Sequence, residues 1–166
     1  MTGNRPNPIR ETDDAVRAEA RALLEEARFG ALGVLDPESG APMVTRVAVG
    51  TTPGGAPLTL ISALSQHTAA LGRSAACSLL VGEPKPTGDP LTHPRLTLQC
   101  DARFVARGTP EHDRLRGRWL ASHPKSKLYV DFADFSFVVL EPRGGFLNGG
   151  FGKAYLLTAE DLLPPA

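Results

Sequence analysis

The sequence predicts a mainly β protein with peripheral α-helices, whose antiparallel strands close into a small barrel. Three observations predict it. About six or seven short apolar segments have strand character, most of them are joined by connections of hairpin length, and the helices that parallel strands need between them are missing. Closure of the barrel removes the exposed strand edges that an open sheet would leave.

Chain length and composition predict a single domain over residues 1–166, with a loose N-terminal arm over residues 1–10. Of the 166 residues, 42% are hydrophobic, which is enough for one substantial core. No apolar run approaches the roughly 20 residues of a membrane span, and the arm lacks a hydrophobic signal segment, so we expect a cytoplasmic protein that binds no membrane. Lys and Arg total 18, as do Asp and Glu, so no global field attracts nucleic acid.

The order of helices and strands places the candidate site residues. Residues 12–27 predict an amphipathic helix with Val16 and Leu24 on its apolar face. Thr109 as N-cap and Pro110 at the first helical position begin another helix. The predicted strands are 29–35, 43–50, 58–64, 75–81, 95–106, 134–142 and 144–150. The second and third of these strands form a hairpin.

Residues 65–68, Ser-Gln-His-Thr, form a polar turn between the strand 58–64 and a short helix that ends near Gly72. The backbone amides in the first turn of a helix have no partner within the helix and attract anions. Four hydrogen-bonding side chains in a row add donors at the same place. An ordinary N-cap, in which Ser65 satisfies the helix and the other side chains are solvated, explains the same residues, so both interpretations stay open.

Arg46 favours the anion-binding interpretation. It alternates with Val44 and Ala48 on one face of its strand, so its charge emerges from an apolar row and needs a partner. The predicted hairpin brings this strand beside the strand that ends in the polar turn. An arginine together with a helix N-terminus is suited to hold a phosphate. A salt bridge from Arg46 to a nearby acid is the alternative.

A glycine-rich segment, GGFLNGGFGKA, occupies residues 144–154. Its glycines allow positive φ and a close approach of the backbone to a ligand. It is not a P-loop, because Leu147 stands where that motif needs Gly and Ala154 where it needs Ser or Thr. A tight turn after the last strand and a ligand-contacting loop are both compatible with it.

Other chemistry-bearing residues form no catalytic or metal-binding pattern. Cys77 and Cys100 each lie within an apolar strand-like run, which is typical of small core residues rather than of a disulfide or a reactive thiol. The histidines are scattered, so no zinc pattern exists and we expect no metal site. No Ser/His/Asp triad or pair of carboxylates occurs in a convincing context.

Six stretches match a known family in order and spacing: PMVTRVAV (42–49), LISALSQHTAAL (60–71), SLLVGEP (78–84), DPLTHPRLTL (89–98), HPKSKLYVDFADFSFVVLEP (123–142) and GGFGKA (149–154). On these stretches the chain resembles the FMN-binding split-barrel proteins of the pyridoxamine 5′-phosphate oxidase-like family, especially the branch related to the bacterial heme-utilisation proteins. The resemblance runs from the first helix to residue 154. It implies an antiparallel split β-barrel, an FMN cofactor, and a two-fold homodimer with two flavin sites at the interface.

The resemblance also implies which residues hold the flavin. Arg46 and the turn Ser65-Gln66-His67 would hold the FMN phosphate, although related positions often carry Ser or Thr followed by Arg or Lys, so this turn is less basic. The other implied contacts are Ile61, Ser62 and the backbone around Val47 and Ala48 along the isoalloxazine ring, Arg95 reaching the flavin, and Phe151, Gly152 and Lys153 near the flavin or its substrate pocket.

Three functions are compatible with this pattern. The first is an FMN-dependent oxidoreductase of unknown substrate, in which the flavin supplies the chemistry and no nucleophilic residue is needed. The second is heme binding and degradation, although every histidine lies at or before residue 123, so no C-terminal axial ligand is available. The third is a non-enzymatic flavin-binding module. Oxidation of pyridoxamine phosphate is not expected, because the Arg-x-His substrate motif of the classical enzymes is missing, and a deazaflavin could replace FMN.

Overall fold

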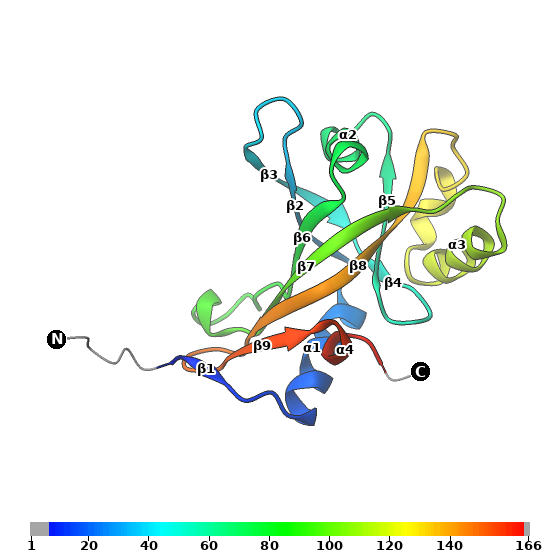
Figure 1. Ribbon diagram of the computed structural model, residues 1–166. Helices are drawn as coiled ribbons and strands as arrows, with labels where there is room; N and C mark the ends of the chain where they lie inside the picture. The colour runs from blue at the N-terminus through cyan, green and yellow to red at the C-terminus, as the bar shows by residue number, and fades with distance from the viewer. Residues whose placement is uncertain (1–6, 165–166) are drawn as a thin grey trace.

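The computed structural model describes residues 7–164 and shows a mainly antiparallel sheet with helices packed around it (Figure 1). The strands are β1 (Ile9–Arg10), β2 (Phe29–Leu35), β3 (Pro42–Ala48), β4 (Gly50–Thr51), β5 (Pro57–Ser62), β6 (Ala76–Val81), β7 (Arg95–Phe104), β8 (Phe135–Asn148) and β9 (Ala154–Thr158). The helices are α1 (Asp14–Glu26), α2 (Gln66–Arg73), α3 (Pro110–Ser122) and α4 (Ala159–Leu162), with 3-10 turns η1 (Pro90–Thr92) and η2 (Pro124–Leu128). Across residues 7–164, no helix is both long enough and apolar enough to cross a membrane.

The sheet divides at its longest strand, β8. One edge of β8 pairs with β7 along most of its length, while the other edge pairs first with β5 and then with β9. The main path of neighbouring strands is β1-β9-β8-β7-β6-β2-β3, and β4 pairs only with β5. The predicted antiparallel split-barrel fold is therefore confirmed.

The sheet is not closed, so the expectation of a closed barrel is wrong. The predicted strand 43–50 is interrupted at Val49, whose amide donates to the carbonyl of Arg28 at 2.9 Å. β3 pairs with β2 along its whole length, and after the break only the two residues of β4 form the predicted hairpin with β5. Between β3 and β5 the structure has a side-chain link instead, in which the Thr59 hydroxyl donates to the Ala48 carbonyl at 2.8 Å.

A short strand near the start of the described chain pairs with a strand near its end. Residues 1–6 of the predicted loose arm lie outside the described residues, but Ile9–Arg10 form β1, the parallel partner of β9. The loose-arm prediction is therefore wrong at residues 9–10. The predicted strands 134–142 and 144–150 are one continuous strand, β8. The register between β7 and β8 shifts between Gln99 and Cys100, so that Arg143 has no partner in β7.

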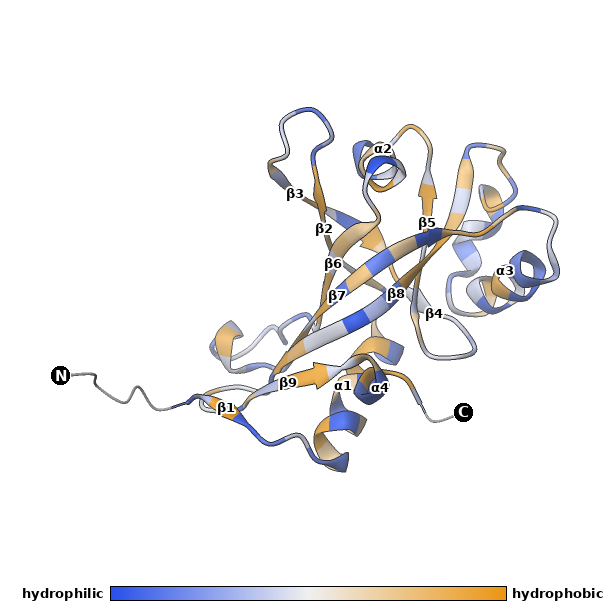
Figure 2. Ribbon diagram, viewed as in Figure 1, coloured by the Kyte–Doolittle hydropathy of each residue, from blue (hydrophilic) through white to orange (hydrophobic). Residues whose placement is uncertain are grey.

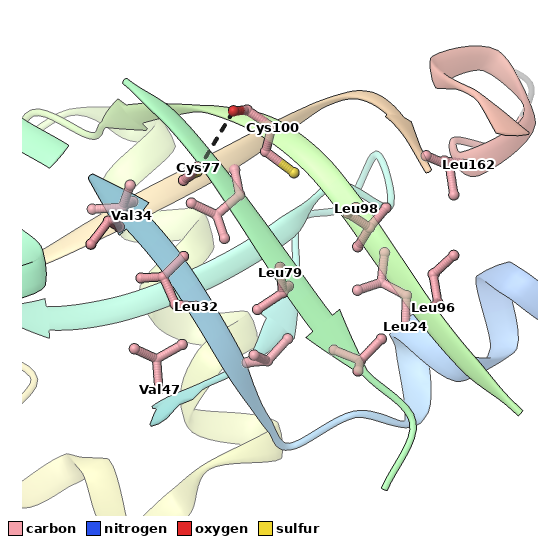
Figure 3. Packing of buried hydrophobic residues seen from close by; sticks show 14 of the residues in the cluster. Leu24, Leu32, Val34, Val47, Cys77, Leu79, Leu96, Leu98, Cys100 and Leu162 are labelled. Atoms are coloured by element: carbon pink, nitrogen blue, oxygen red, sulfur yellow. Dashed lines mark hydrogen bonds between the residues drawn. The ribbon is translucent and has the colours of Figure 1, made fainter. Parts of the chain in front are cut away.

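Alternating apolar residues of β2, β6 and β7 build the larger of two hydrophobic cores. Leu32, Leu79 and Leu98 are fully buried in it, and Figure 3 shows these side chains packed together between the strands. Cys77 and Cys100 are free, buried thiols in the same core, which confirms their predicted role. Burial raises the pKa of the Cys77 thiol to about 11, so this thiol stays protonated and unreactive at neutral pH.

The second core holds α3 against β5 and the first half of β8. Trp119 is its largest buried side chain, packs edge-on against Phe137, and donates from its indole nitrogen to the Ser126 hydroxyl at 3.0 Å. Figure 2 shows that the exposed side of α3 is hydrophilic. The end of β5 and the start of β8 are thereby fixed beside the polar turn.

Candidate functional site

The polar turn of residues 65–68 leads from β5 into α2 as predicted, but Ser65 does not act as an ordinary cap. Ser65 occupies the N-cap position, and its side chain makes no capping hydrogen bond. The first-turn amides of Gln66 and His67 have no carbonyl behind them in the helix, and within residues 7–164 no other group accepts from them. The start of α2 therefore presents open backbone donors, as an anion site requires.

The ring of His67 is turned toward β3 rather than toward solvent. Its Nδ1 lies 3.0 Å from the hydroxyl of Thr45, while its Nε2 is buried and has no hydrogen-bond partner in the described part of the chain. Burial lowers the pKa of His67, so the ring is neutral at physiological pH. His67 thus ties α2 to β3, and it adds no positive charge to the turn.

Arg46 follows Thr45 in β3 and points to the opposite face of the strand, because side chains alternate along a strand. Its guanidinium lies over the ring of Phe29, 5.5 Å from the ring centre, and the residue is exposed. Among the described residues, no acid lies within ion-pair distance of it, so the alternative of a salt bridge is not what the structure shows. Arg46 is a free cation on the strand that contacts the start of α2.

The residues expected along the flavin ring lie on β3 and β5, although their side chains have other contacts. Val47 and Ile61 are buried in the larger core, at 6% and 3% exposure, so their side chains are not available to a ligand. Ser62 donates from its hydroxyl to a carboxylate oxygen of Asp134 at 2.7 Å. The carbonyl of Ala48 accepts from Thr59.

A second group of predicted site residues lies at the other end of the molecule, near η1 and the turn between β8 and β9 (Figure 1). Arg95 donates to the carbonyl of Leu91 at 3.0 Å and so fixes η1. Phe151, Gly152 and Lys153 are exposed in the turn between β8 and β9. One chain therefore does not bring this group together with Arg46 and the polar turn.

The turn between β8 and β9 explains why the glycine-rich segment 144–154 needs a glycine at residue 150. Gly150 has a φ of +112°, and a Cβ there would lie 2.8 Å from the carbonyl oxygen of Thr92. Only glycine fits both this conformation and this contact with η1. The predicted tight turn is present, but it joins β8 to a further strand, β9, rather than following the last strand. Contact of these residues with a ligand stays a prediction.

The sequence did not predict two residues, Thr45 and Asp134, that hydrogen-bond to site residues around the polar turn. Thr45 orients His67, and Asp134 accepts from Ser62. Neither has a local sequence signal, because each acts across a contact between elements far apart in the chain. Only the strand register brings Ser62 beside Phe135, the residue after Asp134.

Comparison with known proteins identifies the family. The family model described as pyridoxamine 5′-phosphate oxidase matches residues 16–148, which include most of the sheet. The chain belongs to this family. The part of the chain that matches this pyridoxamine 5′-phosphate oxidase model contains Arg46, the polar turn and Arg95, whereas residues 151–153 lie just beyond it.

Similar proteins show how the chain relates to longer ones. It is 32% identical over 143 residues to the "Non-canonical heme oxygenase HOZ, chloroplastic" of Arabidopsis thaliana, covering 86% of this chain and 43% of that protein. Atu2129 of Agrobacterium tumefaciens, a solved structure of unknown function, is 30% identical with a TM-score of 0.81, covering 96% of this chain and 66% of that one. A heme binding protein of Mycobacterium smegmatis is 27% identical with a TM-score of 0.79, covering 93% and 61%. The chain thus spans less than half of the plant relative.

Proposed function

We propose that the protein binds FMN by its phosphate where β3 meets the start of α2, and acts as an FMN-dependent oxidoreductase. The observation that carries the proposal is the pair of open first-turn amides of α2, at the place where His67 contacts Thr45 of β3. Arg46, the residue after Thr45, is a cation on the opposite face of β3 with no ion-pair partner among the described residues. A phosphate accepts hydrogen bonds from both kinds of donor, so the proposal requires the Arg46 side chain to turn around the edge of β3 toward the start of α2. When bound, the flavin supplies hydride or electron transfer, and the protein supplies binding and orientation.

A homodimer is part of this proposal, because the second group of site residues lies far from the first in one chain. The strand registers also align an outer row of residues across the sheet, on the face opposite to the larger core. In strand order the row is Arg46, Ala31, Leu80, Thr97, Phe146 and Leu156. Its three largest apolar members are 41%, 37% and 60% exposed, which is typical of a surface that another protein covers. A second copy on this row would carry its Arg95 and its turn between β8 and β9 toward Arg46.

Heme binding is the second candidate, and His67 favours it. A histidine that ligates iron is usually oriented by a hydrogen bond at its other ring nitrogen. His67 has this arrangement, with Nδ1 beside the Thr45 hydroxyl and Nε2 without a partner among residues 7–164. Two of the relatives are named for heme, and the carboxylates of heme are anions that Arg46 would attract.

Titration of the purified protein with FMN and with hemin tests both candidates. We expect FMN to bind with a shift of its visible absorption, and Arg46→Ala to weaken binding about 10- to 100-fold, the equivalent of about 1.4 to 3 kcal/mol. Arg73→Ala, which removes a cation from the other end of α2, is the matched control and should change the affinity less than about threefold.

The outcomes separate the candidates. Failure of FMN to bind, together with a Soret band that His67→Ala abolishes, would replace the first candidate with the second. Binding of FMN that NAD(P)H or a partner reductase does not reduce would instead indicate a flavin-binding module without catalysis. Reduction of the bound flavin supports the oxidoreductase.

A further inference from the structure

We propose that Asp134 is a positioning residue for the cofactor site, because it sets the shape of the turn that presents the amides of α2. Its effect on FMN affinity rests on the function proposed above. Its effect on the turn itself does not, so the two can be measured separately. No pattern in the sequence assigns Asp134 this role.

The first step is a relay through one hydroxyl. Ser62, the last residue of β5, donates from Oγ to Oδ2 of Asp134 at 2.7 Å. The same Oγ accepts from the amide of Leu64 at 3.1 Å. The carboxylate therefore directs the hydrogen of the Ser62 hydroxyl toward itself, which leaves a lone pair aimed at the turn.

The backbone of the turn is fixed at the same place. The amide of Ala63 donates to the carbonyl of Asp134 at 2.7 Å. The carbonyl of Ser62 accepts from the Ser65 amide at 3.1 Å and from the Thr68 hydroxyl at 2.6 Å. These bonds fix the direction in which the chain enters α2.

Hydrogen bonds rather than packing hold this turn. Its apolar side chain, Leu64, is 89% exposed, and Ala63 is exposed as well. If one hydrogen bond is lost, no buried apolar contact of Ala63 or Leu64 holds the turn in place. The free energy needed to open the turn locally would then be small.

Asp134 is itself carried on a fixed segment. Arg107 donates to the carbonyls of Phe132 and Phe135 at 2.6 and 2.8 Å, on either side of Asp134. Phe135 then enters β8 opposite Ser62. The carboxylate has therefore a defined position before it bonds to Ser62.

The charge of Asp134 makes the inference testable with close variants. A carboxylate near the start of α2 repels an anion, so the charge of Asp134 by itself weakens phosphate binding. Asp134 can favour binding only through its hydrogen bond with Ser62. Asp134→Asn keeps an oxygen that accepts from Ser62 and removes the charge. Asp134→Leu keeps a similar size and removes both, and Ser62→Ala removes the relay alone.

The first measurement is the FMN dissociation constant of these variants. We expect Asp134→Leu and Ser62→Ala each to weaken binding about tenfold, the double variant to be no weaker than either single one, and Asp134→Asn to bind as well as the parent or better. Asp131→Leu is the control, since this acid lies in the same segment and pairs with Arg116 instead. Additive losses in the double variant, or a loss in Asp134→Asn equal to that in Asp134→Leu, overturn the role.

The second measurement is amide hydrogen exchange of the ligand-free protein. Asp134→Leu should raise the exchange rates of Ala63 and Leu64 at least several-fold, while Asp131→Leu leaves them unchanged. Ser62→Ala gives the same readout for Leu64 if Asp134→Leu does not fold. Unchanged exchange in the variants overturns the inference. Faster exchange in a protein that never binds FMN supports the inference and overturns only the function proposed above.

Discussion

At the scale of single residues, the sequence placed the candidate side chains but not their directions. Arg46 and Thr45 are neighbours, and the alternation along β3 sends one to the exposed face and the other to α2. The sequence showed Arg46 in a row with Val44, which is 68% exposed in the structure. That row is open to solvent rather than buried. The sequence did not show this, because both faces of the strand carry apolar residues and either face could have met the core.

His67 gives a pH prediction at this scale. Burial lowers the pKa of His67 in the folded protein, whereas the unfolded chain has the ordinary value of about 6.5. As the pH falls below that value, the unfolded chain binds a proton that the folded protein excludes, so stability is full above it and falls until the pH reaches the lowered pKa. We expect His67→Gln to lose less stability than the parent protein between pH 7 and pH 5.

Urea unfolding at the two pH values measures this difference. Gln66→Ala is the matched control, because it changes the neighbouring side chain in the same helical turn and removes no titrating group. The loss of stability of this control between pH 7 and pH 5, its acid loss, should equal that of the parent. An acid loss in His67→Gln as large as in both of these proteins would show that the buried ring does not titrate with folding.

At the scale of elements, local capping signals predicted α1 and α3 well, whereas α4, which starts at a capping box of Thr158 and Asp161, was not predicted. The predicted start of α3, with Thr109 as cap and Pro110 first, is what the structure shows. For α1 the predicted range 12–27 is confirmed within two residues, and Asp13 is its N-cap. Such signals lie within one turn of chain, so a sequence displays them directly.

Elements that depend on distant partners were missed for the same reason. The two-residue strand β1 exists because it lies beside β9, more than a hundred residues later. The break at Val49, which leaves the sheet open, depends on the carbonyl of Arg28. A single sequence shows neither contact, because neither creates a period in hydrophobicity.

Two helix caps that look alike in sequence should differ in stability. The Thr109 hydroxyl accepts from the His112 amide at 3.2 Å, whereas the Ser65 hydroxyl makes no cap bond. We expect Thr109→Ala to lower the free energy of unfolding by about 1 kcal/mol and Ser65→Ala by less than about 0.5 kcal/mol. Chemical denaturation without ligand measures both. Equal losses would mean that Ser65 caps α2 in solution, which would favour the ordinary N-cap interpretation of the polar turn.

At the scale of the whole molecule, the outer row is the feature that a single chain leaves unexplained. The register of five strand pairs aligns it, so no local pattern in the sequence could reveal it. It begins at Arg46 and crosses the sheet as far as β9. This position links the proposed homodimer to the cofactor site, because a cover on the row also covers one side of Arg46.

Leu80→Glu tests this link. Leu80 stands in the middle of the row and is 41% exposed, so the folded chain tolerates a carboxylate there, whereas an apolar interface would have to bury it without a partner. We expect the variant to weaken the dimer at least about 100-fold and to appear as a monomer by light scattering at micromolar concentration, with FMN affinity lost in parallel.

The control for this test is Leu128→Glu. Leu128 is 80% exposed on η2, outside the row, so the same substitution there should leave both assembly and FMN affinity unchanged. A parent protein that is monomeric yet binds FMN would show that one chain completes the site. A Leu80→Glu dimer would show that the copies meet on another face, since a buried glutamate in the middle of the row is incompatible with a tight apolar contact.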